Sequence, residues 1–375
     1  MYLGDMGADV IKIEPIRGDD ARTWGPPFIN GEAAWFVSVN RNKRSLCLDI
    51  RTAKGREVLF NLLDRADVLV ENLNPGKLSA HGLALAELGE RFPHLVICAL
   101  SGFGLDGPDS GLSSYDLIAQ ARSGLMSVTG EDGVPTRVGT ALSDIATGMV
   151  AAFSVTAALV RQQRTGLGEL VDISLLEVDL ALMAPRIASF LAGSPEPQPC
   201  GGRDSVLAVY QRFSTLDNPI VVAVGNDRHW IKACTALGLK SLVADPGLLT
   251  NAGRRDRRQE VVDAFQDVFR YLSSDDALKI LSEAGIPCST IQSLSEVVSN
   301  PQVVARNAIY VQQHPTAGPA RLVSSPWVLR SSQGVRNDHT PSPGLGEHSR
   351  QILAELGLTE VTVDELTRDG VVWAP

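Results

Sequence analysis

The first hundred residues alternate between short apolar runs and longer amphipathic segments. Four runs rich in Val, Ile and Leu have the length of buried strands, and they lie at residues 8–14, 45–50, 68–70 and 95–100. Apolar positions at helical spacing occupy two segments between them, residues 54–66 and 83–91. Strands that alternate with helices predict an α/β fold with a doubly wound parallel sheet, in which ligands bind at the carboxyl ends of the strands.

One long apolar segment dominates the middle of the chain. Residues 145–161 are nearly all apolar and predict a buried helix. A strand follows at 171–174, then a second helix at 175–191, and then a stretch rich in Pro and Gly from 193 to 202. We interpret that stretch as a domain boundary, because few contacts cross such linkers.

Beyond this break the pattern changes to a mixed α+β type. Two strands joined by Asp217-Asn218-Pro219 predict a hairpin, and helices follow around 229–237, 257–269 and 274–284. From about Trp327 the chain is rich in Pro and Gly until a helix at 349–356. We therefore expect a large domain over residues 1–195, a smaller α+β domain over 205–325 and a C-terminal segment over 326–375.

The beginning of the chain is unusual for a parallel-sheet domain. Such a domain normally starts with a strand and a turn before its first helix. Here residues 1–6 resemble the tail of a helix, and the strand at 8–14 follows directly. We therefore expect that a first strand–helix unit of roughly two dozen residues is missing from this sequence.

Composition and charge exclude several classes of function. The net charge of −9 over 375 residues disfavours nucleic acid or an anionic membrane as the main partner. No apolar run reaches the roughly 18 residues of a membrane span, and the start lacks the basic and apolar regions of a signal peptide. Five scattered cysteines form no CxxC pair, and six histidines lack metal-ligand spacing. We expect a cytoplasmic protein with reduced thiols and no metal site.

One carboxylate stands where a segment of small residues meets the long apolar helix. Gly139, Thr140, Ala141 and Ser143 leave space around Asp144. An acid just before a helix is commonly an N-cap, whose oxygen accepts free backbone N–H groups. It can equally serve as a carboxylate nucleophile, which needs access and nearby donors for a developing oxyanion. Position alone leaves both interpretations open.

Motifs along nearly the whole chain resemble those of the family III CoA-transferases, the group that includes formyl-CoA and carnitine CoA-transferases. The central signature is YDLIAQARSGLM at 115–126, followed by PTRVGTALSDIATGMVAA at 135–152. Further matches in the right order are GADVIKIEP (7–15), NRNKRSLCLDIR (40–51), ADVLVENLNPG (66–76), SGFGLDGP (101–108), RTGLGELVDISLLE (164–177), VAVGNDRHW (222–230) and PGLGEHSRQIL (343–353). No single motif is decisive, but the ordered set is specific.

The resemblance implies that Asp144 is the nucleophile of CoA transfer between two carboxylic acids, through an aspartyl anhydride and an aspartyl-CoA thioester. It implies a Rossmann-like large domain that binds an acyl-CoA as substrate, with no permanently bound cofactor. It also implies an interlocked homodimer in which the C-terminal segment returns to the large domain. Family positions that contact CoA correspond to Leu48, Asp49, Ile50, Arg51, Asn72, Leu73, Asn74, Ser113, Ser114, Tyr115 and Asp116. A Gly-rich substrate loop corresponds to Gly201 and Gly202, although this shorter match also fits a plain interdomain turn.

Two departures from the family pattern affect the CoA site. Pro15 and Ala80 occupy positions where a family member can carry a basic residue. Other cations could replace these contacts, and the candidates are Arg22, Lys77 and Arg44. Arg51 fits a solvated surface charge about as well as a phosphate ligand, and Asp116 also fits a first-turn helix acid.

A few residues bear on the identity of the substrates and on two alternative functions. Segment 115–176 and His314-Pro315-Thr316 are most similar to members that use succinyl-CoA or another dicarboxylyl-CoA, and Arg137 could pair with a distal carboxylate. A related α-methylacyl-CoA racemase would use a His–Asp pair for proton transfer. Tyr115 stands where that His is expected, so the racemase ranks lower. An inactive CoA-binding or subunit protein is the other alternative, if the missing start is real.

Overall fold

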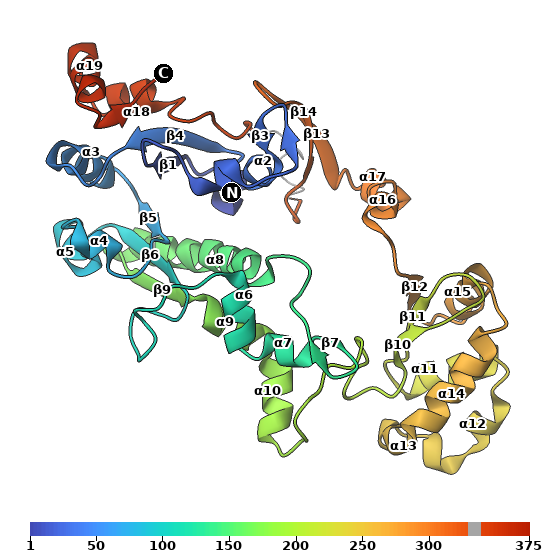
Figure 1. The fold of residues 1–375 in the computed structure, drawn as a ribbon. Helices are drawn as coiled ribbons and strands as arrows, with labels where there is room; N and C mark the ends of the chain where they lie inside the picture. The colour runs from blue at the N-terminus through green and yellow to red at the C-terminus, as the bar shows by residue number, and fades with distance from the viewer. Residues whose placement is uncertain (329–338) are drawn as a thin grey trace. The chain divides into compact units, whose positions relative to one another are not determined.

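The computed structural model describes residues 1–328 and 339–375, and it divides into two compact units (Figure 1). The first unit combines residues 1–116, 142–178 and 298–375, and the second combines residues 117–141 and 179–297. The chain therefore passes between the units four times. The predicted domain ranges stay predictions: 1–195, 205–325 and 326–375, of which residues 329–338 lie outside the described residues.

Two three-stranded sheets form the framework of the first unit. In one sheet, β1 (Val10–Glu14) pairs in parallel with β4 (Lys43–Leu48), and β15 (Val372–Trp373) pairs antiparallel with β4. In the other, β5 (Val68–Glu71), β6 (Val96–Ser101) and β9 (Leu170–Ser174) are all parallel. The parallel α/β character is confirmed. The first unit departs from the expected doubly wound parallel sheet at β15, which pairs antiparallel with β4 and is too short to leave a strand pattern in the sequence.

One hydrophobic core holds both sheets of the first unit. It contains Leu46 from β4, Ile97 from β6 and Leu59 from α3 (Ala53–Leu63), each no more than 5% exposed. Side chains from α5 (Leu85–Arg91), α18 (Ser349–Glu355) and α19 (Glu360–Arg368) complete it. The sequence predicts α18 but not α19, whose nine residues bury only Val363 and Leu366.

The long helix α8 (Leu142–Thr165) packs against β6 and β9. Its inner face contributes Ala151 and Val155 to a second core. The predicted helix begins three residues earlier than expected, and the expectation that it is fully buried is wrong, since Phe153 on its outer face is 75% exposed. Contrary to the expectation that no segment is long and apolar enough to span a membrane, α8 meets that test among the described residues, as a helix in a protein core also can.

The second unit is built on an antiparallel sheet. β10 (Tyr210–Phe213) and β11 (Ile220–Ala223) form the predicted hairpin, and β12 (Cys288–Thr290) adds to β11. Trp230 and Phe265 stack in its core, supplied by α11 (Asp227–Ala236) and α14 (Arg258–Phe269). After α11, this unit also contains α12 (Lys240–Ala244), α13 (Asn251–Asp256), α15 (Ser274–Glu283) and α16 (Leu294–Val297).

The helix expected at 175–191 is two helices, α9 (Leu175–Leu182) and α10 (Ala184–Leu191). Pro185 stands in the first turn of α10, where its missing N–H costs nothing, but it cannot continue α9. The segment after Tyr115 likewise forms two helices, α6 (Asp116–Arg122) and α7 (Leu125–Val128), with Gly124 between them. A hairpin that the sequence pattern does not predict, β13 (Ile309–His314) with β14 (Gly318–Val323), belongs to the first unit.

Candidate functional site

The first turn of α8 lies at the carboxyl edge of the parallel strands. At its other end, α8 stops at Thr165 and a short turn leads into β9. Gly168 in this turn donates a hydrogen bond to Pro93 O (2.7 Å), and a Cβ on Gly168 would lie 2.0 Å from Leu95 O, just before β6 begins. α8 therefore runs antiparallel to β6 and β9, and its N-terminus lies where these strands end. Ligands of parallel sheets bind at this edge.

Asp144 is the third residue of α8 and is exposed. Since the helix begins at Leu142, Asp144 lies inside the first turn, and the N-cap interpretation is wrong for this residue. An anionic side chain in a first turn is still favoured by the helix dipole. Ala141 and Ser143, which flank this turn, are buried, whereas Gly139 and Thr140 are exposed. The carboxylate therefore has the access that a nucleophile needs.

Asp116 fixes the start of the same helix. Its Oδ1 accepts a hydrogen bond from the backbone N–H of Ser143 (2.9 Å), and Asp116 is only 7% exposed. The chain leaves the first unit directly after Asp116 and returns at Leu142. Asp116 therefore supports the turn that carries Asp144, and this role requires no contact with CoA.

The Gly-rich loop after β6 packs against the segment before Asp116. A Cβ on Gly102 would lie 2.2 Å from Ser114 Cβ, so only glycine fits between the loop and this segment. Asp172 on β9 accepts a hydrogen bond from Leu105 N (3.0 Å) and holds the loop from its other side. Tyr115 is 74% exposed, and Ser113 is exposed as well. The structure thus brings Ser114, Asp116 and Asp144 to one edge of the first unit.

The residues after β4 differ in their availability for CoA. Leu48 is 2% exposed and belongs to the core, while Asp49 and Ile50 are partly buried. Arg51 donates hydrogen bonds to both carboxylate oxygens of Asp49, from Nε (2.8 Å) and Nη2 (2.7 Å). These bonds from Arg51 lower the pKa of Asp49. Arg51 remains 71% exposed, so its guanidinium is both oriented and accessible.

Asn72, Leu73 and Asn74 form an exposed loop directly after β5. The backbone N–H of Leu73 donates to Glu71 Oε2 (3.1 Å), and burial raises the pKa of Glu71. The loop follows a parallel strand, where a ligand is expected. Its position agrees with the predicted CoA contact, which stays a prediction.

Gly201 and Gly202 adopt positive φ angles of 65° and 76° in an exposed turn of the second unit. Gly201 N donates to Gly130 O (2.7 Å), and Gly133 N donates to Pro199 O (3.1 Å). The turn is therefore fastened to the hairpin of β7 (Gly130–Glu131) and β8 (Val134–Pro135). A fastened, exposed glycine turn is compatible with both interpretations, substrate loop and interdomain turn.

Two of the three cations suggested as replacement phosphate ligands are already engaged. Arg22 donates to Glu14 Oε1 (2.7 Å), and Arg44 forms ion pairs with Asp9 and Glu355. Lys77 remains exposed at the start of α4 (Lys77–Ala80). Arg17, in the loop after β1, is a further cation that the sequence analysis did not consider; it is 78% exposed and pairs with Asp20 (3.5 Å).

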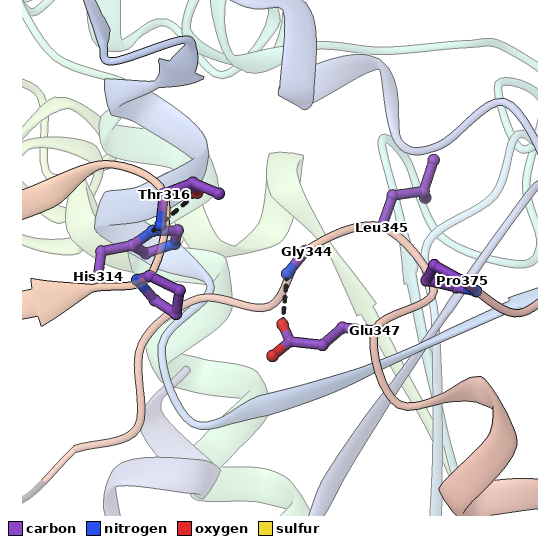
Figure 2. A pocket seen from close by; sticks show the side chains of 7 residues that line it. His314, Thr316, Gly344, Leu345, Glu347 and Pro375 are labelled. Carbon is purple, nitrogen blue, oxygen red and sulfur yellow. Dashed lines mark hydrogen bonds between the residues drawn. The ribbon is translucent and has the colours of Figure 1, made fainter.

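A cavity of about 370 Å³ lies elsewhere in the first unit, between the β13–β14 turn and the residues that precede α18 (Figure 2). His314 lies beside it and is held by contacts on both ring nitrogens. Its Nδ1 accepts from the backbone N–H of Ala317 (3.0 Å), and its Nε2 lies 2.9 Å from Ser342 O. Glu347 Oε2 accepts from Gly344 N (2.7 Å), and both residues line the cavity (Figure 2). None of the predicted catalytic or CoA-binding residues lines this cavity, although His314, Pro315 and Thr316, which resemble members that use a dicarboxylyl-CoA, do. The described residues contain no cluster of metal ligands.

Fold and site together define an α/β protein with an exposed carboxylate on a helix N-terminus at the carboxyl edge of a parallel sheet. The family model described as CoA-transferase family III matches residues 1–349. The chain belongs to this family and is an enzyme that transfers CoA, with a CoA thioester as substrate.

Relatives and a solved structure agree with this assignment. The chain is 39% identical to a Mus musculus protein named succinyl-CoA:glutarate CoA-transferase, over 99% of this chain and 86% of that protein. It is 35% identical to an Agrobacterium fabrum protein named succinate–glutarate CoA-transferase, over 96% of this chain and 92% of that protein. The crystal structure of a CAIB/BAIF family protein from Brucella suis matches with a TM-score of 0.80 and 35% identity, covering 94% of this chain and 93% of that one.

Proposed function

We propose that this enzyme moves CoA from a dicarboxylyl-CoA such as succinyl-CoA to an acceptor carboxylic acid, with Asp144 as the covalent nucleophile. The observation that carries the proposal is the exposed position of Asp144 in the first turn of α8, at the ligand-binding edge of the sheet. The names of relatives with 35–39% identity support a dicarboxylic substrate.

The reaction needs two covalent states of Asp144. A carboxylate oxygen attacks the thioester carbonyl carbon of the donor, the C–S bond breaks, and CoA leaves as a thiolate from a mixed anhydride. The thiolate then attacks the Asp144 carbonyl carbon, and the donor acid leaves as a carboxylate from an aspartyl-CoA thioester. The acceptor carboxylate repeats both steps in reverse. Each state keeps the acyl group activated, so no external energy source is required.

Backbone N–H groups of the first α8 turn favour the negative charge that develops on the attacked carbonyl oxygen. Tyr115 is exposed and directly precedes Asp116, whose carboxylate holds this turn, and it can orient an acyl carboxylate. Arg51 and the Asn72–Asn74 loop, both of which follow parallel strands, are suited to hold the phosphates of CoA. We assign Gly201 and Gly202 to the loop that excludes water, because both intermediates hydrolyse.

We also infer a homodimer, with the outer face of α8 covered by a second copy of the chain. Ile145, Met149 and Phe153 follow one another at a spacing of four residues and are 39%, 45% and 75% exposed. An apolar row of this kind is seldom left in water on a long helix. The interlocked arrangement expected from the family resemblance provides the occupant.

The test combines mass spectrometry with a matched pair of variants. Wild-type enzyme is mixed with succinyl-CoA, trapped with hydroxylamine and digested, and a modification is expected on the peptide that contains Asp144. Asp144→Asn should remove it, whereas Asp64→Asn, which changes an exposed acid at the end of α3, should not. An unmodified wild-type enzyme that binds free CoA would support the inactive CoA-binding alternative. Deuterium exchange at the α-carbon of a branched acyl-CoA, without an adduct, would support the racemase.

A further inference from the structure

A dense run of arginines in the second unit is only partly neutralised. Residues 254–258 read Arg-Arg-Asp-Arg-Arg. Arg254 is 3% exposed and is paired with Asp227, and Arg257 is paired with Asp245 (2.5 Å) and with Glu260. These two guanidinium groups therefore stabilise the fold of the second unit and are not available for a ligand.

Arg258 holds the segment that follows the Gly201–Gly202 turn. Its Nη1 donates to Asp204 O (2.6 Å) and its Nη2 donates to Leu207 O (2.8 Å). Asn251 Nδ2 binds Val206 O (2.9 Å) in the same segment. Both acceptors of Arg258 are neutral carbonyl groups, so its guanidinium makes no direct hydrogen bond to a carboxylate among the described residues, although the side chain is partly buried.

Two more arginines flank this point. Arg203 directly precedes the residue whose carbonyl Arg258 binds, and Arg255 lies three residues before Arg258; both are exposed. Within residues 1–328 and 339–375, none of these three arginines forms an ion pair. Burial lowers the pKa of Arg258, and the positive charge of Arg203 and, to a smaller extent, Arg255 lowers it further, against the opposing charge of Asp204.

Crowded cations of this kind are stabilised by a bound anion. The Asp204 carboxylate supplies one negative charge against three positive ones, and its Oδ1 also accepts the backbone N–H groups of Val206 and Leu207 (both 2.7 Å). Arginine presents several N–H donors in a plane that matches the oxygens of a carboxylate or a phosphate. In a chain with a net charge of −9, such a cluster is also the kind of local field that attracts anionic ligands.

We propose that Arg203, Arg255 and Arg258 form a binding site for a compact oxyanion, a carboxylate or phosphate group, at the end of the glycine turn in the second unit. Two substrates of the enzyme could supply such a group: the free carboxylate of a dicarboxylic acid and the phosphates of CoA. A role in transfer rests on the proposed function, whereas anion binding itself does not.

The first experiment measures binding of inorganic phosphate and of succinate by calorimetry at low ionic strength, with Asp144→Asn so that no turnover interferes. Arg203→Gln and Arg255→Gln are suitable variants because both side chains are exposed and neither holds the fold. Each should weaken binding of at least one of the two anions by roughly tenfold, as expected when a charged hydrogen bond is lost. Arg270→Gln, which removes an exposed arginine paired with Asp267, serves as the control and should change nothing.

Steady-state kinetics of the same arginine variants, with Asp144 present, distinguishes a dicarboxylate ligand from a CoA phosphate. A higher KM for the dicarboxylic acid alone assigns a carboxylate ligand. A higher KM for succinyl-CoA, which disappears when 3′-dephospho-succinyl-CoA is used, assigns a CoA phosphate. Unchanged phosphate and succinate binding in both variants overturns the site. Absence of a covalent adduct in wild type would instead reject the proposed function, and the calorimetry would still decide on the anion site.

Discussion

Asp116 accepts a hydrogen bond of 2.9 Å from the backbone N–H of Ser143, across a separation of 27 residues. The intervening residues 117–141 belong to the second unit, so this bond joins the two points at which the chain leaves and re-enters the first unit. The Asp116 carboxylate thus anchors the turn that carries Asp144. The first prediction concerns this anchor.

Asp116→Ala should lower the free energy of unfolding by about 1–3 kcal/mol, since it leaves a buried backbone donor unpaired. It should also slow formation of the covalent adduct, because the turn that carries Asp144 loses its support. Asp116→Asn keeps an acceptor oxygen and should retain most of both properties. Hydrogen exchange at the amide of Ser143 and single-turnover rates measure the two effects. Equal protection of this amide in wild type and Asp116→Ala would contradict the assignment.

Asp144→Ala should abolish CoA transfer while the protein stays folded, because the residue is exposed and its loss leaves no cavity. If Asp144 contributed only a favourable interaction with the helix dipole, the substitution would instead lower stability by about 0.3–1 kcal/mol and leave turnover intact. Turnover with succinyl-CoA and the midpoint of thermal unfolding, measured on the same preparation, distinguish the two results.

Gly102→Ala should impair catalysis more than stability. The added Cβ would lie 2.2 Å from Ser114 Cβ and force the segment that carries Tyr115 and Asp116 to move. We expect a loss of at least about tenfold in kcat/KM, since small displacements of catalytic groups are costly. Gly148→Ala is the matched control within α8, because its Cβ meets no atom within 4 Å. It should keep full activity and gain up to about 1 kcal/mol of stability.

The stability of the first unit should fall in acid through two buried carboxylates. Burial raises the pKa of Asp5, but hydrogen bonds from Arg41 and Ser325 outweigh it and lower the value below the usual range; Glu14 behaves in the same way with Arg22. Because the unfolded chain therefore takes up protons first, these groups stabilise the fold fully above the unfolded pKa of about 4. Their contribution is lost as the pH falls through the folded values.

Urea unfolding between pH 6 and pH 3 measures this loss. Arg41→Met, which leaves the Asp5 carboxylate buried without its ion-pair partner, should cost roughly 3–5 kcal/mol at neutral pH and flatten the acid dependence. Asp20→Asn, a change at an exposed acid, provides the control. A wild-type unfolding free energy that does not change over this range would contradict the prediction.

Phe153→Asp should disrupt the inferred dimer, because it places a charge in the apolar row on the outer face of α8. Light scattering after gel filtration should report a smaller mass, or a mixture of masses that depends on concentration. Leu294→Asp, at an 84% exposed apolar residue of the second unit, is the control and should leave the mass unchanged. A monomeric wild type would reject the dimer directly.

The strands and helices of the first hundred residues were predictable because they repeat one strong pattern. β1, β4, β5 and β6 are short apolar runs, and α3 has a clear apolar face. The two-residue strand β15 and the mostly polar α19 carry no comparable signal, and long-range packing alone places them against β4 and α18.

The candidate site was predictable to the level of individual residues only through the family resemblance. The local sequence pattern allowed Asp144 to be either a helix cap or a nucleophile. The structure excludes the N-cap interpretation, because the helix begins at Leu142. The bond from Ser143 to Asp116 could not be read from the sequence, since a contact between residues 27 positions apart depends on the path of the intervening chain. Likewise, the engagement of Arg22 and Arg44 in ion pairs depends on tertiary neighbours.

The interleaved connectivity of the two units constrains the order in which a nascent chain can mature. The second unit has all of its residues once position 297 has left the ribosome, whereas the first unit still lacks one neighbour of β4 and the helices that cover its core. Until these emerge, β4 presents an unpaired edge and apolar surface, the two features by which incomplete proteins aggregate. Synthesis of this enzyme therefore passes through a stage in which the unit that carries Asp144 is the unprotected one, and chaperone dependence should concentrate there.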